Sequence, residues 1–457
     1  MTCSRASSFW LIVLAAAGAA LPAAAVPARA DEPQGPGASR AAFDTLTVEQ
    51  CIALARTQGA AVQSAAADAE AARLESVVAG YNRRPSWSVL GDLIVAPKGS
   101  YDPVLTNLGE YQLKAGAEWP LFDAGNRRRD RERASVHALS AALELERTGR
   151  EAALRAATVA TELLRQRETE SRGLQSVEWL ENLASLVRSG VRGGAQSRSD
   201  AVRVALERDA ALAALESARQ ETDALARELG QILRRPDRTP VVLEPASPDG
   251  EPPSAEDSLA VMAWVERAPE ARQAQAEAAL GRIELEQARR RNALQVGLAA
   301  DAGLAGADLT SPIPDELKAA HPDATFGDRL RRDLGASVSL QFHRPVLDPA
   351  TQPAAAAREE ALRSVQLRAE AERGERRRLA LDLLERWRAA ARRVTLGTES
   401  SARAADQLVR LKSMYAGGAV ALLELLDARR QLDDARERLA DGRFESRLAR
   451  YEAEIMR

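Results

Sequence analysis

Apolar residues recur every three to four positions over unusually long stretches of this chain. The clearest stretch runs from Trp119 to Asp200 and, after Pro120, contains no further proline. Its regularly spaced apolar positions include Leu174, Val177, Leu180, Leu183 and Val187. This spacing predicts an amphipathic helix with a narrow apolar seam. A helix of about 70 residues is roughly 100 Å long, more than a compact domain of ordinary size requires.

The same pattern occurs a second time later in the chain. Asp123 lies 71 positions before the glycine at 194, and Asp348 lies 70 positions before the glycine at 418. Both long runs therefore start and end with matching residues. We interpret the chain as a tandem duplication of one long unit.

Before each long helical run, apolar and polar residues alternate with a period of two. This alternation predicts two strand hairpins, at 86–95/110–119 and at 294–304/333–342, the second around a longer loop at 305–332. The cleanest apolar stripe consists of Tyr111, Leu113, Ala115, Ala117 and Trp119. Each predicted strand spans ten to eleven residues, the length of a tilted membrane-crossing strand. Four strands of a soluble sandwich are the alternative, which the long flanking helices disfavour.

Four strands are too few to close a barrel, and an open edge in lipid leaves backbone groups unpaired. We therefore expect other copies of the chain to complete the barrel. Two copies give eight strands, filled by their own side chains, and three give twelve, wide enough for a lumen. The faces expected to point inward carry Gln112, Lys114, Glu118, Gln295, Asp301 and Ser337, which suits a wet interior.

The pattern divides the chain into five segments. We expect a signal peptide at 1–30, a flexible leader at 31–44, a first repeat at 45–235, a linker at 236–254 and a second repeat at 255–457. In each repeat a helix precedes the strand hairpin, and the first of these continues unbroken from residue 46 to Pro85. A long helix, a tip turn at 190–198 or 416–421 and a return helix follow. The two shorter helices must stack end to end to match the long one.

Composition agrees with long, thinly packed helices, because 28% of residues are charged and only 4% are aromatic. The apolar run from Phe9 and the sequence Ala28-Arg29-Ala30 are typical of a secretory signal with its cleavage site. After cleavage only Cys51 remains, so no internal disulfide forms. The net charge of −3 gives no reason to expect nucleic-acid binding.

The order of these motifs resembles that of the TolC-type outer-membrane efflux family, over almost the whole mature chain. The residues that carry the resemblance are Leu46 to Gln50, Trp119 to Gly125 with a weaker copy at Pro345, Ala268 to Glu270, and the turns 194–200 and 415–427. The resemblance implies a mainly α fold with a small β part. Long antiparallel coiled-coil helices would form a periplasmic α-barrel, and four transmembrane strands per protomer would contribute to a twelve-stranded barrel shared by a homotrimer.

The resemblance also implies a function. It places the protein in the outer membrane of a Gram-negative bacterium, extending into the periplasm. There it would be the channel component of a tripartite efflux or type I secretion system. Its partners would be the outer-membrane lipid, a periplasmic adaptor protein and, through the adaptor, an inner-membrane pump. Family members export drugs, metal ions or proteins, and the sequence does not select among these substrates.

The functional residues of the family match particular positions here. The resemblance implies adaptor-contacting tips at Gly194, Ala195, Gly418 and Ala419. It implies a periplasmic entrance constriction at Asp200, Tyr415, Glu424 and Asp427. Carboxylates that face a narrow lumen favour cations, and a multivalent cation bound there blocks passage. One position differs from the family pattern. Val420 stands where the family prototype has an arginine, which there bonds to the acid matched here by Asp200.

Other residues give weaker indications. No spacing of Cys, His and Asp resembles a metal site, although His343 lies at a strand end. No catalytic or phosphate-binding motif is present, so we expect neither enzymatic activity nor a cofactor. Aromatic girdles at membrane interfaces are one interpretation of Trp87, Tyr111, Trp119 and Phe342. The alternative function is a soluble periplasmic coiled-coil adaptor or scaffold, which does not explain the duplicated alternating stripes.

Overall fold

A computed structural model describes residues 45–93, 111–194, 196–235, 241–244, 258–306, 313, 315–346 and 348–456. The expected signal peptide and leader lie outside the described residues. The first repeat contains β1 (Thr45–Leu46), α2 (Val48–Gln58), α3 (Ala60–Tyr81), β2 (Ser86–Leu93), β3 (Tyr111–Phe122), α5 (Asn126–Arg192) and α6 (Arg198–Ile232). After β4 (Val242–Leu243), the second contains α7 (Ser258–Arg267), α8 (Pro269–Arg289), β5 (Gln295–Gly306), α9 (Asp315–Ala320), α10 (Phe326–Asp333), β6 (Leu334–His343), α11 (Thr351–Ala416) and α12 (Leu422–Met456).

The helix expected to run unbroken to Pro85 is in fact two helices, α2 and α3, which meet at Gly59. The backbone of Gly59 is extended, with φ −54° and ψ 141°, so the helical hydrogen bonds stop there. The second repeat breaks 209 positions later, between α7 and α8, where Ala268 has φ −56° and ψ 136°. Ala268 precedes Pro269, whose ring disfavours the helical conformation of the preceding residue. The duplication therefore extends to these breaks.

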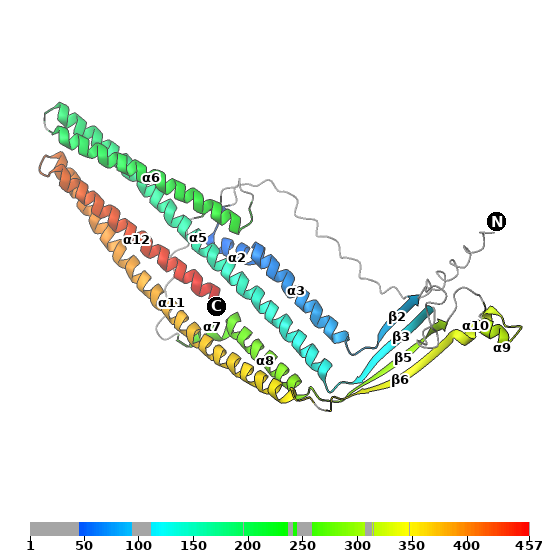
Figure 1. The fold of residues 1–457 in the computed structure, drawn as a ribbon. Helices are drawn as coiled ribbons and strands as arrows, with labels where there is room; N and C mark the ends of the chain where they lie inside the picture. The colour runs from blue at the N-terminus through cyan, green and yellow to red at the C-terminus, as the bar shows by residue number, and fades with distance from the viewer. Residues whose placement is uncertain are drawn as a thin grey trace, which may run out of the picture. The chain divides into compact units, whose positions relative to one another are not determined.

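Two helices dominate the fold, α5 with 67 residues and α11 with 66. Each is about 100 Å long at 1.5 Å per residue. Helix α6 returns along α5 and α12 along α11, while α3 and α8 pack against the parts of α5 and α11 that are closer to the strands (Figure 1). Among the described residues, no helix joins enough length to enough apolarity to cross a membrane.

Apolar side chains gather in separate clusters along these helices, as expected for thin seams. One cluster joins α2, α5 and α6 to the paired strands β1 and β4, with Cys51 and Leu163 fully buried. Tyr451 of α12 is part of it and donates a hydrogen bond of 2.9 Å from its hydroxyl to Oε1 of Glu49. The end of the second repeat is therefore fastened to the start of the first.

The predicted linker contains a short strand. Val242 and Leu243 form β4, which pairs in parallel with Thr45 and Leu46 of β1. Arg167 of α5 stabilises this connection by donating to the carbonyl oxygens of Val241, at 2.9 Å, and Leu243, at 3.3 Å. A prediction from Pro and Asp content alone missed it, because two residues of strand are too short to give a period.

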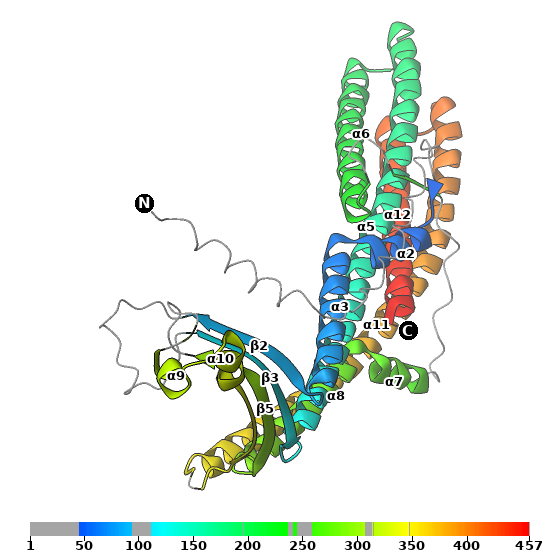
Figure 2. The same ribbon diagram turned by 90° about the vertical axis from the view of Figure 1, so that its right-hand side faces the viewer.

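The longer strands form one antiparallel sheet in the order β2, β3, β5, β6, which is curved in Figure 2. The pairing of β3 with β5 joins the two repeats, with Lys114 opposite Gly303 and Gly116 opposite Asp301. A bulge between Pro120 and Phe122 ends the regular register of β3 just before α5.

The predicted loop 305–332 also contains regular structure. Its described residues form α9 and α10, and α10 contacts β5 and β6. Thr325 caps α10, accepting from the Asp328 amide while the Asp328 carboxylate accepts from the Thr325 amide at 2.9 Å. Arg329 and Asp333 form an ion pair of 3.3 Å with only 6% of either side chain exposed. These helices were missed because they are too short for a helical period to be recognised.

Candidate functional site

The first tip turn joins α5 to α6. Helix α5 ends where Gly194 adopts a left-handed backbone with φ +74°, which only glycine adopts without strain. The Gly194 amide donates to the carbonyl oxygen of Val191 at 3.2 Å, and the Gln196 amide donates to that of Gly190 at 3.2 Å. The turn is therefore closed by backbone hydrogen bonds, with its glycine exposed. Ala195, an expected adaptor contact, lies outside the described residues.

The second tip turn repeats this geometry between α11 and α12. Gly418 also has φ +74°, and its amide donates to the carbonyl oxygen of Tyr415 at 3.0 Å. The Ala419 amide donates to the carbonyl oxygen of Met414 at 2.9 Å. A Cβ added at Gly194 or Gly418 meets nothing within 4 Å, so neither glycine is required by neighbouring atoms. Both are required by the backbone angle.

Two acids occupy matching positions, six residues after the tip glycines, but their local surroundings differ. Asp200 is the third residue of α6 and belongs to a capping box, in which its amide donates to Ser197 Oγ at 3.1 Å and its carboxylate accepts from the Ser197 amide at 3.4 Å. Glu424 is the third residue of α12, where Ala421 stands at the capping position. Ala421 offers no side-chain oxygen, so the exposed Glu424 carboxylate is not held in this way.

Tyr415 connects the two tips. Its side chain is buried in a cluster that contains Leu183 and Val187 of α5 and Leu422 and Leu425 of α12. Burial and the negative charge of Asp200 raise the pKa of the Tyr415 hydroxyl. The Gln196 side chain faces this hydroxyl, but no hydrogen bond of good geometry forms to it among the described residues.

The other expected entrance acid, Asp427, lies on the same exposed side of α12 as Glu424, three residues further on. The Asp427 carboxylate is 3.5 Å from the guanidinium of Arg430. Arg430 also forms an ion pair with Glu207 of α6. Of the two expected entrance acids on α12, Asp427 is thus partly neutralised, and only Glu424 has no ion pair within the described part of the chain.

One buried charge close to these acids was missed by the sequence reasoning. The guanidinium of Arg429 lies 5.3 Å from the ring centre of Trp179 on α5, and Nε is 3.0 Å from Oδ2 of Asp433. Cation and ring attract each other most strongly when water is excluded, as it is here. Arg429 occupies a position in the apolar seam of α12, between Leu425 and Leu432. A charged residue at a position where the spacing calls for an apolar one is the sequence signal that could have identified it.

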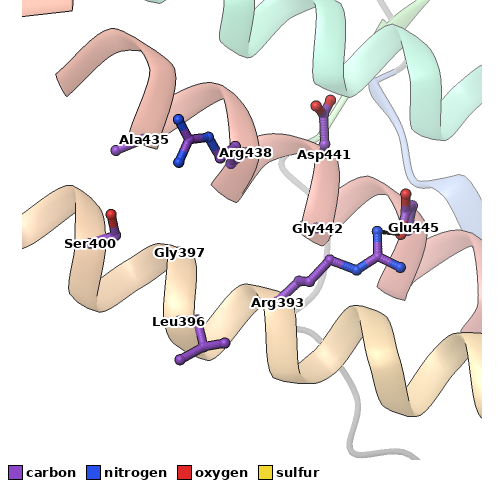
Figure 3. Close-up of a pocket in the computed structure, with 9 residues that line it drawn as sticks. All are labelled: Arg393, Leu396, Gly397, Ser400, Ala435, Arg438, Asp441, Gly442 and Glu445. Carbon is purple, nitrogen blue, oxygen red and sulfur yellow. Dashed lines mark ion pairs between the residues drawn. The ribbon is translucent and has the colours of Figure 1, made fainter. Parts of the chain in front are cut away.

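A groove of about 440 Å³ lies between α11 and α12, away from the tips (Figure 3). Its two glycines, Gly397 and Gly442, let the helices approach, because a Cβ at Gly397 would lie 3.1 Å from the backbone of Leu439. Arg393 reaches across the groove to Glu445, at 2.5 Å. No group of three metal-ligating side chains occurs here or elsewhere in the described residues.

The two faces of the sheet differ in character. Strand register places the six polar residues predicted to share a face together, and Ser337 Oγ donates to Oδ1 of Asp301 at 2.6 Å. The opposite face carries Trp87, Val89, Leu113, Trp119, Val338, Leu340 and Phe342, all exposed. Trp87 is 80% exposed and Val338 74%, which is unusual for side chains of this size on a folded domain.

These features together define a class of fold, in which duplicated helical hairpins with glycine turns are attached to a short antiparallel sheet. No family model and no curated protein matches the sequence. Solved outer-membrane proteins have this fold, and the resemblance to the TolC-type family is confirmed at that level. The chain is similar to CusC, with TM-score 0.72 and 14% identity over 91% of this chain and 92% of that chain. It is similar to VceC from Vibrio cholerae, with TM-score 0.69 and 13% identity over 90% and 95%. It is also similar to the Campylobacter jejuni outer-membrane channel CmeC, with TM-score 0.69 and 12% identity over 91% and 86%.

Proposed function

We propose that this protein is the channel component of a tripartite efflux or type I secretion system in the outer membrane of a Gram-negative bacterium. The observation that carries the proposal is the sheet, with exposed large apolar side chains on one face and polar side chains on the other. Lipid on the apolar face and water on the polar face match this division. A protein of this kind is a conduit and not an enzyme.

The edges of the sheet support a shared barrel. Strands β2 and β6 are the outer strands of the four, and each has one unpaired row of backbone groups. Alternate strands run in opposite directions, so β6 of one protomer can pair antiparallel with β2 of the next. Three protomers then close a ring of about twelve strands, which leaves a lumen, whereas about eight would be filled by side chains. We propose a homotrimer on this basis.

The helical hairpins supply the periplasmic part of the proposal. Both tip turns project Gly194 and Gly418 into solvent, with Ala419 beside the second, and these turns are the proposed contacts for the periplasmic adaptor. Through the adaptor they would reach an inner-membrane pump. The proposed entrance is formed by Glu424, with Asp427 beside it, and by Asp200, and the buried side chain of Tyr415 packs between the two hairpins there.

Membrane fractionation followed by single-channel recording tests this function. The mature protein should remain in the outer-membrane fraction after salt and carbonate washes, and the purified trimer should conduct ions across a planar bilayer. Release by carbonate as a water-soluble monomer would refute the channel and favour the coiled-coil scaffold. In the bilayer, Glu424→Ala with Asp427→Ala should weaken block by multivalent cations, because the carboxylates that attract the ion are gone. Unchanged block by multivalent cations would show that neither carboxylate lines the entrance.

A further inference from the structure

Arginines are concentrated at one end of the sheet, where strands give way to helices. The four connecting segments, 82–85, 123–133, 288–294 and 343–350, contain eleven arginines and four acidic residues, hence a net charge of +7. Strand pairing brings these segments to a single edge, because Ser86 lies opposite Glu118 and Gln295 lies opposite His343. We call this edge the arginine belt.

Contacts across the belt show that its segments lie together. The Arg290 guanidinium, at the end of α8, donates to the carbonyl oxygen of Ala124 at 3.5 Å. Its neighbour Arg291 pairs with Asp348 before α11 at 2.9 Å. The belt is thus continuous across both repeats and is not a set of unrelated surface charges.

Much of this charge has no acidic partner within the protein. Among the described residues, five exposed arginines of the belt form no ion pair, namely Arg83, Arg84, Arg131, Arg290 and Arg344. Each guanidinium keeps most or all of its five donors, which match the geometry of phosphate oxygens. Like charges gathered at one edge repel one another, so an anionic partner is favourable there.

Aromatic residues of the apolar face lie at the same edge. Trp119 and Phe122 are close to the end of β3, Trp87 is the second residue of β2, and Phe342 is the last but one of β6. All four are at least 47% exposed. Aromatic rings beside cationic side chains mark the level where a membrane passes from acyl chains to headgroups. Two independent features therefore indicate the same plane.

We propose that the arginine belt binds the phosphates of anionic phospholipids in the periplasmic leaflet. This inference rests on the proposed function, which puts the helices in the periplasm and the sheet in the membrane. The sequence between the strands of each hairpin differs, since segments 94–110 and 305–333 contain five basic and eight acidic residues, hence −3. Phosphate attraction is thus a property of the helical end alone.

The test compares two variants with equal loss of charge. The belt variant carries Arg→Gln at Arg83, Arg84, Arg131, Arg290 and Arg344. The control carries Arg→Gln at five exposed arginines of the long hairpins that form no ion pair among the described residues, Arg203, Arg227, Arg392, Arg410 and Arg438. Each purified trimer is exposed to mixed phosphatidylglycerol and phosphatidylcholine, and the lipids it retains are counted by native mass spectrometry.

Wild type and control should retain phosphatidylglycerol preferentially. The belt variant should lose this preference, with affinity for the anionic headgroup falling roughly fivefold for each contacting arginine removed. Unchanged preference in the belt variant, or equal loss in the control, would overturn the proposal.

Two further measurements keep the result interpretable. The preference of the wild-type protein for phosphatidylglycerol should disappear near 1 M salt, where the screening length is about 3 Å. This measurement uses the wild-type protein alone, so it does not depend on whether a variant folds. Preference that survives such salt would refute an electrostatic belt. Carbonate-resistant insertion of wild type into pure phosphatidylcholine vesicles reports on the channel proposal alone. Failure to insert would refute the channel, whereas insertion without phosphatidylglycerol preference would refute only the belt.

Discussion

Replacing Gly194 with Ala should loosen the first tip turn, whereas replacing its neighbour Gly193 should not. The two glycines are adjacent and exposed, but only Gly194 has a positive φ, +74° against −81° for Gly193. An added Cβ meets nothing within 4 Å at Gly194 and only ordinary contacts, at 3.6 Å or more, at Gly193. The pair therefore isolates the backbone angle from every other effect.

The expected magnitude follows from that angle. A residue with a Cβ in the left-handed region costs roughly 1–2 kcal/mol, and nothing near Gly194 offsets this cost. At Gly193 alanine should be neutral or stabilise by up to about 1 kcal/mol, because it restricts the unfolded chain. Asn at Gly194 should recover part of the loss, since Asn tolerates the left-handed region better than Ala. The second tip repeats the contrast with Gly418 and Gly417.

Amide hydrogen exchange is the appropriate assay, because the tip can open without global unfolding. Exchange of the Gln196 amide, which is bonded to the Gly190 carbonyl oxygen, should quicken roughly 5- to 30-fold in Gly194→Ala, the equivalent of 1–2 kcal/mol. Adaptor affinity should fall by up to the same factor if the adaptor binds the closed turn. Equal exchange in the Gly193 and Gly194 variants would refute the reasoning, since the φ angle would then carry no cost.

Three further predictions concern the helices. Arg430→Ala removes the ion pair to Glu207 between α12 and α6. Because the Arg430 side chain is 58% exposed, the loss should lower the free energy of unfolding by less than about 1 kcal/mol and raise basal conductance. Unchanged conductance would exclude a role of this ion pair in closing the channel. Gly397→Leu should lower the stability of the folded protein by about 1–3 kcal/mol through overpacking against α12, whereas Gly374→Ala, with nothing within 4 Å of the added Cβ, should raise it, and thermal unfolding distinguishes the two. Burial raises the pKa of the Cys51 thiol to about 11, so maleimide at pH 8 should label it only after denaturation, and rapid labelling of the folded protein would contradict this burial.

The duplication and the long helices could be predicted because their signals extend over tens of residues. The breaks at Gly59 and Ala268 were missed although both had signals, an isolated glycine and a residue before proline. Alanine-rich sequence after Gly59 favours a helix on propensity alone, and that propensity concealed the break. Helices α9 and α10 and strands β1 and β4 were missed because elements so short are specified by tertiary contacts rather than by period.

The entrance residues stay a prediction that rests on the resemblance to the TolC-type family. Their distance from the tip glycines matches that family, but it does not show which carboxylates are available to bind a cation. The ion pair of Arg430 with Glu207 joins residues 223 positions apart, and no local pattern encodes such a contact. In contrast, the different capping of Asp200 and Glu424 can be recognised in the sequence. Ser197 completes a capping box with Asp200, whereas Ala421 has no side-chain oxygen with which to do so for Glu424.

That difference gives a direct test of Glu424. Ala421 occupies the capping position of α12, because its carbonyl oxygen accepts from the Leu425 amide at 3.4 Å. Ala421→Ser should complete the capping box with Glu424, stabilise the folded protein by about 1 kcal/mol and hold the Glu424 carboxylate against the backbone, as Ser197 holds Asp200. Thermal unfolding should register the gain, and single-channel recording should register weaker cation block, as in Glu424→Gln. Val420→Ser places the hydroxyl one residue too early and should do neither. If Ala421→Ser stabilises the protein but leaves block unchanged while Glu424→Gln abolishes it, a capped carboxylate still binds the ion, and the distinction between the two acids is wrong.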